Sequence, residues 1–523
     1  MVNKILFLLG ILIVVSCSEN KTQYATISKA ELINKIKGGW AGKMIGVRYG
    51  SAFEFKSTGK IIEDAIHWSP EMVEGALEED DLYVQLTFLS AMGKYQGLKT
   101  PVINLAEDFA HADYGVCHAN LQARKNLLDG IMPPLSGTPK YNMHANDIDF
   151  QIESDFIGFM NPGMPSSAVL MADSVGRILA YGDGLYGGMF VAAMHSLAFF
   201  EKDAKTIVVK ALKCIPAESK YAQAIQTVIA GYNSDPKDWK KTWAVLQEKY
   251  GDTDICVPFH PFNIDASLNG AYIVMGLLYG NNDLSKTIEI AVRCGQDTDC
   301  NAASTAGIIG VMCGYDAIDE NFKSYIPKIE DKLFFYTNYS FNKAVLQTHI
   351  FAEENILANG GRVKNDIFKV KLQEPRFTGT LEQSFPGKKA SYQVLMTQND
   401  QYQLIGNWKD FTYGDGDDYL FKVSTKPGDI FDMNFKGTGF SVKGRFDIDG
   451  GTALAYIDDK PLREFNCYYP GSDCAKWDSN RYHIISAMDL NDGEHQLKIE
   501  VLNKKQPESR GNKIYIERVI IYE

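Results

Sequence analysis

Acidic side chains stand at three points of the chain where an apolar segment begins or ends. Residues 297–299 read DTD and precede the small-residue run AASTAGIIG, and residues 79–81 read EDD before a run that begins LYVQL. A lone Glu54 closes a glycine-punctuated turn. Oxygen atoms at such spacings can converge on a hard divalent cation, to which the Thr298 hydroxyl could also bind. The acids therefore predict a metal site.

Helix capping is the alternative interpretation of these acids. Carboxylates in a first helical turn are favoured by the helix dipole, and aspartate is a good N-cap. Capping explains the pair in the DTD motif less well, because the apolar helix predicted over 302–313 buries its ends, where unpaired carboxylates are costly. Arg293 is the cation that lies near this motif in the sequence. A metal ion is therefore the better counter-charge.

Helices must position these acids. From about residue 27 to 365, helical signals dominate, and the first helix is predicted to start at a Ser28 cap. Segments 187–201, 266–280 and 302–314 are apolar nearly all round and rich in Ala and Gly. This composition is typical of buried helices that approach their neighbours closely. Residues 27–365 are therefore predicted to form one all-α domain.

The pattern changes after about residue 370. Residues 371–523 contain short alternating segments separated by Gly, Asp and Asn turns, which predict about eight strands in a jelly-roll β-sandwich. This part resembles galactose-binding domains and could bind carbohydrate. Its loop aromatics either pack internally or form a surface on which sugars stack. They are Tyr468, Tyr469, Trp477 and Tyr482.

The N-terminus predicts export. Residues 1–20 combine one lysine, an apolar run too short for a comfortable membrane span, and Cys17 after small residues. This resembles a bacterial lipoprotein signal with Cys17 as the lipidated residue, and a plain signal peptide is the alternative. The mature protein is thus expected to be exported, periplasmic or on the cell surface, with any membrane contact made through a lipid anchor at Cys17.

Cysteine spacing and net charge indicate which other ligands the chain is expected not to bind. No Cys-x-x-Cys pair is present, so no structural zinc site is predicted, whereas Cys467 and Cys474 could form a disulfide in an oxidising compartment. The chain has 53 basic and 65 acidic residues, a net charge of −12. An acidic surface repels a phosphate backbone, which disfavours nucleic-acid binding.

Taken together, Glu54, the EDD triplet and GQDTD before a small-residue helix resemble the ADP-ribosylglycohydrolase family. The resemblance covers most of residues 30–320 and implies a compact all-α domain that uses two Mg²⁺ or Mn²⁺ ions to hydrolyse a bond at the anomeric carbon of a ribose. It implies Glu54 and Asp297 as catalytic residues. The implied metal ligands are Glu79, Asp80, Asp81, Asp297, Asp299 and Cys300.

Three positions depart from the family pattern. The family's early Gly-Asp-x-x-Gly has Lys43 in place of the acid, and Glu79 and Cys300 stand where the family has a serine or threonine ligand. Glu79 adds negative charge, and a thiol is a poor ligand for Mg²⁺. These changes leave metal binding possible and argue against a preference for ADP-ribose.

Polar residues between the motifs could line a sugar pocket, with loop capping as the alternative for about half of them. The candidates are His118, Asn120, Asp149, Glu153 and Asp183. The sequence GDGLYG at 182–187 fits a dinucleotide-binding fingerprint but lacks alternating strands and helices around it, so its glycines are expected to allow close helix packing instead.

These features predict an exported, metal-dependent glycosidase that releases a neutral, pentofuranose-like sugar from a glycan or another sugar-containing molecule. Scarce cations around the motifs and abundant acids and aromatics favour a neutral sugar over a diphosphate. The alternatives are a hydrolase of ADP-ribosyl proteins or nucleotides, and a non-catalytic glycan-binding protein on the cell surface.

Overall fold

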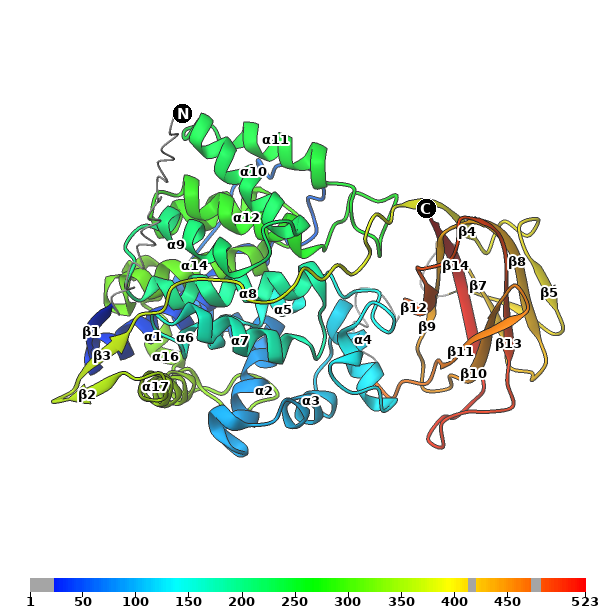
Figure 1. The fold of residues 1–523 in the computed structure, drawn as a ribbon, viewed down its shortest axis with the longest axis horizontal. Helices are drawn as coiled ribbons and strands as arrows, with labels where there is room; N and C mark the ends of the chain where they lie inside the picture. The colour runs from blue at the N-terminus through cyan, green and yellow to red at the C-terminus, as the bar shows by residue number, and fades with distance from the viewer. Residues whose placement is uncertain (1–22, 413–419, 472–480) are drawn as a thin grey trace, which may run out of the picture.

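The computed structural model describes residues 23–412, 420–471 and 481–523. A helical part and a β-sandwich lie side by side along the long axis of the molecule (Figure 1). The predicted order of a helical domain followed by an all-β domain is confirmed. The predicted signal segment 1–20 with Cys17 lies outside the described residues, as do Cys474 and Trp477. Within the described residues, no helix is long and apolar enough to span a bilayer.

The helical part consists of α-helices joined by loops and short 3₁₀ turns. The longer helices are α1 (Lys29–Gly50), α2 (Asp80–Lys94), α3 (Val102–Ala110), α4 (His118–Leu128), α7 (Pro165–Gly176), α8 (Gly182–Ala198), α9 (Ala204–Ala211), α10 (Lys220–Ser234), α11 (Trp239–Tyr250), α12 (Ala266–Tyr279), α13 (Leu284–Arg293), α14 (Thr298–Cys313) and α17 (Phe341–Ala358). The short ones are α5 (Asp149–Ile152), α6 (Asp155–Phe159), α15 (Glu320–Lys323) and α16 (Ile326–Ile329). The 3₁₀ turns are η1 (Pro70–Glu78), η2 (Gly97–Lys99), η3 (Leu135–Gly137), η4 (Leu212–Cys214) and η5 (Tyr315–Ala317).

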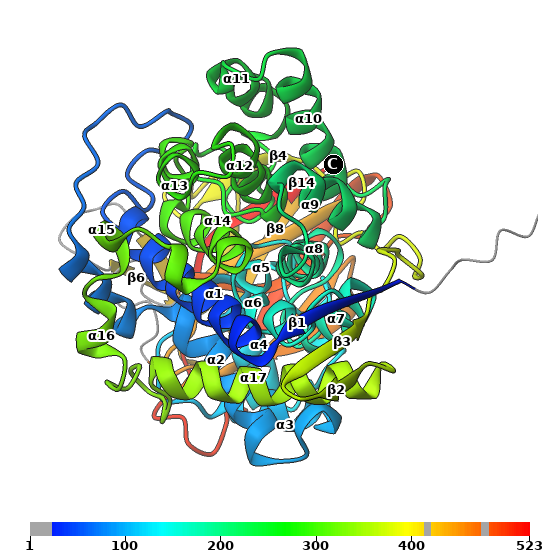
Figure 2. The ribbon, with the colours of Figure 1, turned by 90° about the vertical axis from the view of Figure 1, so that its left-hand side faces the viewer.

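Helices α1, α8 and α14 lie at the centre of the helical part, with the other helices around them (Figure 2). Along α1 every fourth residue of one face is a glycine, and each of these glycines lies against the backbone of α14. A Cβ atom there would come within 2.2–2.3 Å of a carbonyl oxygen, so only glycine permits the contact. The contacts are Gly38 with Gly310, Gly42 with Ala306, Gly46 with Ala302, and Gly50 with Thr298.

This antiparallel contact brings the end of α1 to the beginning of α14. Glu54, which follows α1, is thereby carried to the DTD motif that opens α14. The Ser28 cap is confirmed, because its side chain accepts a hydrogen bond of 3.1 Å from the Glu31 amide. The glycines of GDGLYG lie in α8, where a Cβ on Gly184 would fall 2.2 Å from Ala145 O, and one on the following Gly188 would fall 2.2 Å from the ring of Phe150. They therefore serve packing, as expected.

A small sheet closes the helical part. Strand β1 (Tyr24–Ser28) pairs with β3 (Ile367–Lys371), and β3 pairs with β2 (Arg362–Lys364). The helical part therefore includes three short strands that join its two ends. Beyond β3 the chain stays attached to the helices, because Gln373 N donates to Gly163 O at 3.1 Å and Glu382 N donates to Tyr186 Oη at 2.7 Å.

The sandwich consists of two antiparallel sheets, with β11-β10-β13-β8-β5 in one and β12-β9-β14-β7-β6 in the other, where β4 also pairs with β14. More strands are present than the eight predicted, because several are only three to five residues long. They are β4 (Ala390–Leu395), β5 (Gln403–Ile405), β6 (Lys409–Thr412), β7 (Leu420–Ser424), β8 (Ile430–Gly437), β9 (Gly439–Arg445), β10 (Thr452–Ile457), β11 (Lys460–Asn466), β12 (Arg481–Ala487), β13 (Gly493–Val501) and β14 (Ile514–Tyr522).

The two parts contact each other directly. The backbone amide of His118, at the start of α4, donates to Tyr482 Oη at 3.1 Å, and Tyr522 Oη donates to Ile255 O at 2.9 Å. Tyr469 and Tyr482 are both buried, which favours packing over an exposed stacking surface for these two aromatics.

The predicted Cys467–Cys474 disulfide is wrong. Cys467 is a free thiol with no exposed surface, because its side chain packs inside the sandwich. Cys117, just before α4, is disulfide-bonded instead.

Candidate active site

Three helix ends bring the predicted acids together. Asp80 and Asp81 lie in the first turn of α2, Asp299 lies in the first turn of α14, and Glu54 lies in the turn after α1. Ligand atoms of Asp81, Asp299 and Cys300 lie within 4.8 Å of one another, although Asp81 is more than 200 positions before the other two in sequence. The acidic centre is defined here as Glu54, Glu79, Asp80, Asp81, Asp297 and Asp299.

Gln296 fixes Glu54 next to the DTD motif. Its backbone carbonyl oxygen accepts a hydrogen bond of 3.0 Å from Phe55 N, and its backbone N–H donates to Ser57 O at 3.1 Å. The backbone of Gln296 is left-handed, with φ of 59°. The turn that holds Glu54 and the turn that begins α14 therefore form one hydrogen-bonded unit.

Helix capping accounts for only part of the acidic centre. Asp297 is the N-cap of α14 and accepts a hydrogen bond of 3.4 Å from Cys300 N. Asp299 is 4 % exposed, and its Oδ1 has no hydrogen-bond partner among the described residues. A buried carboxylate oxygen without a partner is costly, and a cation would satisfy it. The carboxylates of the acidic centre offer only oxygen atoms, which fits Mg²⁺ or Mn²⁺, and Cys300 Sγ is the one sulfur atom in the group with Asp81 and Asp299.

Burial and mutual repulsion make the acidic centre hard to ionise. Burial, followed by the charge of Asp299, raises the pKa of Glu54 to about 9. Burial also raises the pKa of Glu79, Asp80 and Asp299 to about 7, and that of Asp297 well above its ordinary value. A divalent ion reverses this because it stabilises the charged form of each carboxylate.

Lys43 supplies one built-in positive charge. Its Nζ lies 2.9 Å from Asp81 Oδ1 and 3.0 Å from Asp155 Oδ2, and all three side chains have no exposed surface. Burial alone would lower the pKa of Lys43, but the charges of Asp155 and Asp81 together raise it above its usual range. Lys43 therefore holds one oxygen of Asp81 and leaves the other, Oδ2, toward Asp299 and Cys300.

Glu79 and Cys300, which stand where the family has a serine or threonine ligand, each contact another residue of this chain. The Glu79 carboxylate forms an ion pair with Arg48 from the last turn of α1. The Cys300 thiol donates to Asp81 Oδ2 at 3.1 Å, and burial raises the pKa of this thiol well above its ordinary value. The Thr298 hydroxyl donates to Gly50 O at 2.8 Å across the α1–α14 contact, so its hydrogen is engaged by α1.

Most of the predicted sugar-binding residues form a second polar group beside the acidic centre. Asn120 N donates to Asp149 Oδ1 at 2.9 Å, and Asn120 Nδ2 donates to Glu153 Oε1 at 2.5 Å. Burial raises the pKa of Asp149 to about 7 and that of Glu153 well above its ordinary value, and Asp80 adds to the shift of Glu153. His118, at the start of α4, lies next to this group with its side chain 26 % exposed.

Asp183 lies away from the acidic centre and from the Asn120 group. Its Oδ1 accepts a hydrogen bond of 2.9 Å from Tyr221 N, which caps the start of α10. It faces a cavity of about 560 Å³ lined also by Lys220, Asp254 and Phe385. The acidic centre is not part of this cavity. The structure thus does not bring Asp183 together with the other candidates.

Aromatic residues beside the acids were not predicted. Phe55 follows Glu54 and packs on Phe262 with ring centroids 4.8 Å apart, and Phe262 stacks on His118 at 6.0 Å. Tyr83, two residues after Asp81, packs on Tyr336 with centroids 5.4 Å apart. Phe55 and Tyr83 could have been found from their places next to the acidic motifs. Phe262 and Tyr336 come from distant loops and carry no such signal.

A helical domain in which carboxylates from three helix ends converge has the donor groups of a divalent-metal site. Residues 28–345, more than half of the chain, match the family model described as ADP-ribosylglycohydrolase. The chain belongs to the ADP-ribosylglycohydrolase family. Membership indicates a hydrolase that acts on a glycosyl-type bond of a sugar-containing substrate.

Solved structures give distant matches. The chain is similar to an ADP-ribosylglycohydrolase-related protein complex with 12 % identity and a TM-score of 0.44, over 62 % of this chain and 99 % of that one. It is also similar to a family two carbohydrate esterase from Cellvibrio japonicus, with 12 % identity and a TM-score of 0.19, over 26 % of this chain and 34 % of that one. A search of curated proteins found no match.

Proposed function

We propose that the protein is an exported glycoside hydrolase that uses two divalent ions, Mg²⁺ or Mn²⁺, to cleave at the anomeric carbon of a neutral furanose sugar. The observation that carries the proposal is the acidic centre, in which buried and half-buried carboxylates lie close together and Asp299 Oδ1 has no partner among the described residues. Bound cations would offset the cost of burying these charges.

Asp80, Asp81, Asp297 and Asp299 would hold the ions. When bound, the ions supply a Lewis acid that orients sugar hydroxyls and lowers the pKa of an attacking water. Lys43 orients Asp81 through its ion pair of 2.9 Å, so that Oδ2 faces the ions. Glu79 and Cys300 would complete the site only by giving up their present contacts with Arg48 and Asp81.

Glu54 is the proposed proton donor to the leaving group. Its pKa of about 9 keeps it protonated at neutral pH, as a general acid requires. Bound cations would lower this value toward neutrality, where a general acid is most effective. Asp297 would act with the ions as an acceptor for the proton of the attacking water.

A neutral sugar fits the surroundings better than a diphosphate. The nearby cations Lys43 and Arg48 are both held in ion pairs. Asn120, Asp149 and Glu153 offer hydroxyl-binding groups, and the rings of Phe262 and Tyr336 flank the acids. Hydrolysis of ADP-ribosyl substrates is the second candidate, which the family itself favours.

Export is supported by residues 1–20 and by the disulfide at Cys117, since disulfides persist in oxidising compartments. A lipid anchor at Cys17 would retain the protein at a membrane. If the sandwich binds glycan, it would hold the hydrolase near its polymer and raise the local substrate concentration.

The test is a panel of nitrophenyl furanosides, nucleosides and ADP-ribose conjugates with Mg²⁺ or Mn²⁺. We expect turnover of a neutral furanoside by the wild type, loss of turnover in Asp299→Asn and Glu54→Gln, and retention in the matched variant Asp183→Asn. Efficient ADP-ribose release with no activity on a neutral glycoside would select the second candidate. Glycan binding without any turnover would indicate a non-catalytic protein.

A further inference from the structure

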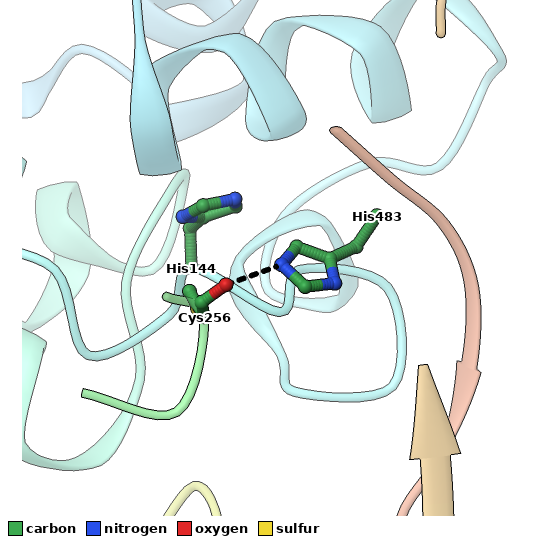
Figure 3. Close-up of side chains that lie close together, drawn as sticks. All are labelled: His144, Cys256 and His483. Carbon is green, nitrogen blue, oxygen red and sulfur yellow. Dashed lines mark hydrogen bonds between the residues drawn. The ribbon is translucent and has the colours of Figure 1, made fainter. Parts of the chain in front are cut away.

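Two loops of the helical part and one strand of the sandwich meet at a second cluster of metal-binding side chains. His144 lies in the turn that precedes α5, Cys256 lies in the loop between α11 and α12, and His483 lies on β12. Figure 3 shows the three side chains gathered at one point. Their ligand atoms lie within 4.8 Å of one another, and none of the residues is more than 4 % exposed.

His144 is oriented as a metal-binding histidine usually is. Its Nδ1 lies 2.6 Å from Asp147 Oδ2, and Asp147 is 2 % exposed. With Asp147 ionised, this contact places the proton on Nδ1 and leaves a lone pair on Nε2. Nε2 is buried and has no hydrogen-bond partner among the described residues. Histidines that bind a metal nearly always donate their other N–H to a carboxylate or carbonyl in this way.

His483 and Cys256 each have hydrogen-bond partners close to the cluster. His483 Nδ1 contacts Ser441 Oγ, and His483 Nε2 lies 3.2 Å from Cys256 O, the contact that is dashed in Figure 3. The Cys256 thiol donates to Met143 O at 2.9 Å. Donation from His483 Nδ1 to Ser441 would free Nε2 for a metal.

The protonation states of His144, His483 and Cys256 favour a soft cation. Burial lowers the pKa of His144 well below its ordinary value and that of His483 to about 3, so both imidazoles carry lone pairs at neutral pH. Burial raises the pKa of the Cys256 thiol well above its ordinary value, so a thiolate forms there only with a compensating cation. The nearby negative charges of Asp147 and Asp254 also raise the pKa of this thiol and would attract a cation. The positive charge of Lys443 lowers the pKa.

We propose that His144 Nε2, Cys256 Sγ and His483 Nε2 bind one Zn²⁺ ion at the junction between the two parts of the molecule. Nitrogen and sulfur ligands select Zn²⁺ over Mg²⁺. Ligands at about 2.0–2.3 Å from a tetrahedral ion lie roughly 3.3–3.8 Å apart, so small side-chain rotations close the site. The Cys256 proton leaves to solvent as the thiolate binds, and a water takes the fourth position.

The site has a structural consequence and is independent of the proposed function. His483 is the neighbour of Tyr482, whose Oη accepts from His118 N at the start of α4. An ion that joins β12 to both loops therefore fixes the sandwich where it contacts α4, next to the Asn120 group. His144, Cys256 and His483 are scattered over 340 positions of sequence and form no Cys-x-x-Cys pattern.

The experiment uses the full-length chain, stripped with a chelator and titrated with Co²⁺ and then with Zn²⁺. We expect one Co²⁺ with a near-ultraviolet thiolate-to-cobalt charge-transfer band that Zn²⁺ abolishes. Cys256→Ser should lose the band, and Cys214→Ser, which alters another buried free thiol, should retain it. Asp147→Asn should keep the band and weaken Zn²⁺ binding by about 10–100-fold, as removal of a carboxylate that orients a ligand does.

His483→Gln keeps the thiol and tests the bridge between the two parts. We expect it to weaken Zn²⁺ binding and to alter the band. An unchanged band and affinity in His483→Gln would overturn the role of the sandwich in the site. Absence of a thiolate band in the folded wild type, or its persistence in Cys256→Ser, would overturn the site itself. Circular dichroism of each variant separates loss of the ion from loss of the fold.

Discussion

The acidic centre and the His144–Cys256–His483 junction are opposite solutions to the burial of polar groups. The acidic centre gathers like charges at helix N-termini, where burial raises the pKa of Asp80 and Asp299 to about 7. The junction gathers neutral nitrogen and sulfur atoms from loops and a strand. The comparison teaches that ligand chemistry and local architecture go together. Helix dipoles favour hard, anionic ligand sets, and loops between domains accommodate soft, neutral ones.

The substitution with the largest expected effect removes the positive charge that balances the acidic centre. Lys43→Met leaves Asp81 and Asp155 buried without their shared cation. We expect unfolding free energy to fall by about 3–5 kcal/mol, as removal of one partner from a buried ion pair does. The measurement is chemical denaturation in the presence of a chelator.

Lys35→Met is the matched control. Among the described residues, Lys35 Nζ donates only to the backbone oxygens of Val311 and Met312, at 3.1 and 2.8 Å, and is partly solvated. Its loss should cost about 1 kcal/mol. Equal losses in the two variants would mean that Lys43 does not balance the acidic centre.

The next largest effect is a pH dependence of stability that arises from the acidic centre and not from the His144–Cys256–His483 junction. Glu79, Asp80 and Asp299 have folded-state pKa values of about 7, above the ordinary 3.8–4.5 of unfolded carboxylates. A raised carboxylate pKa stabilises the fold at low pH, and this contribution is lost as the pH rises from about 4 through 7. The metal-free protein should therefore melt at a lower temperature at pH 8 than at pH 5.5.

Mg²⁺ should reverse this trend, because it binds the ionised carboxylates. At a hundred times its Kd it should add about 2.7 kcal/mol per bound ion at pH 8 and less at pH 5.5. Thermal melts with and without Mg²⁺ at both pH values give the measurement. An equal Mg²⁺ effect at both pH values would contradict the assignment.

The smallest effect concerns substrate contact. Phe262 stacks on His118 with ring centroids 6.0 Å apart and should contact the bound sugar. Phe262→Leu should raise KM about 2–10-fold and leave kcat nearly unchanged, since an aromatic contact contributes about 0.5–1.5 kcal/mol. Phe411→Leu, which alters an aromatic contact inside the sandwich, is the control and should leave KM unchanged. A fall in kcat alone would place Phe262 outside the sugar site.

Sequence patterns were sufficient wherever the determinant was local. The small-residue run after Asp299 and the apolar run after Asp81 predicted buried helices, and their first turns predicted where the acids converge. The alternation after residue 371 predicted the sandwich. Periodicity and capping act within a few residues, so they can be recognised without knowledge of the fold.

What the sequence did not disclose depends on contacts between distant segments. The Thr298 hydroxyl reaches Gly50 O because the glycine lets α1 approach α14 within hydrogen-bond distance. Lys43 was recognised as a departure, but its pairing with Asp155 required the fold. The junction was missed because Cys256 and His483 belong to different parts of the chain and share no motif.

The most direct test of the acidic centre is a Mn²⁺ titration of the metal-free chain, followed by calorimetry and electron paramagnetic resonance. The prediction is two Mn²⁺ ions per wild-type chain and an unchanged stoichiometry in Cys256→Ser. In Asp299→Asn, binding should weaken by more than about 100-fold, since even carboxylates that only orient ligands contribute about 10–100-fold. Unchanged Mn²⁺ binding in folded Asp299→Asn, or no binding to the wild type, would contradict a metal-dependent acidic centre.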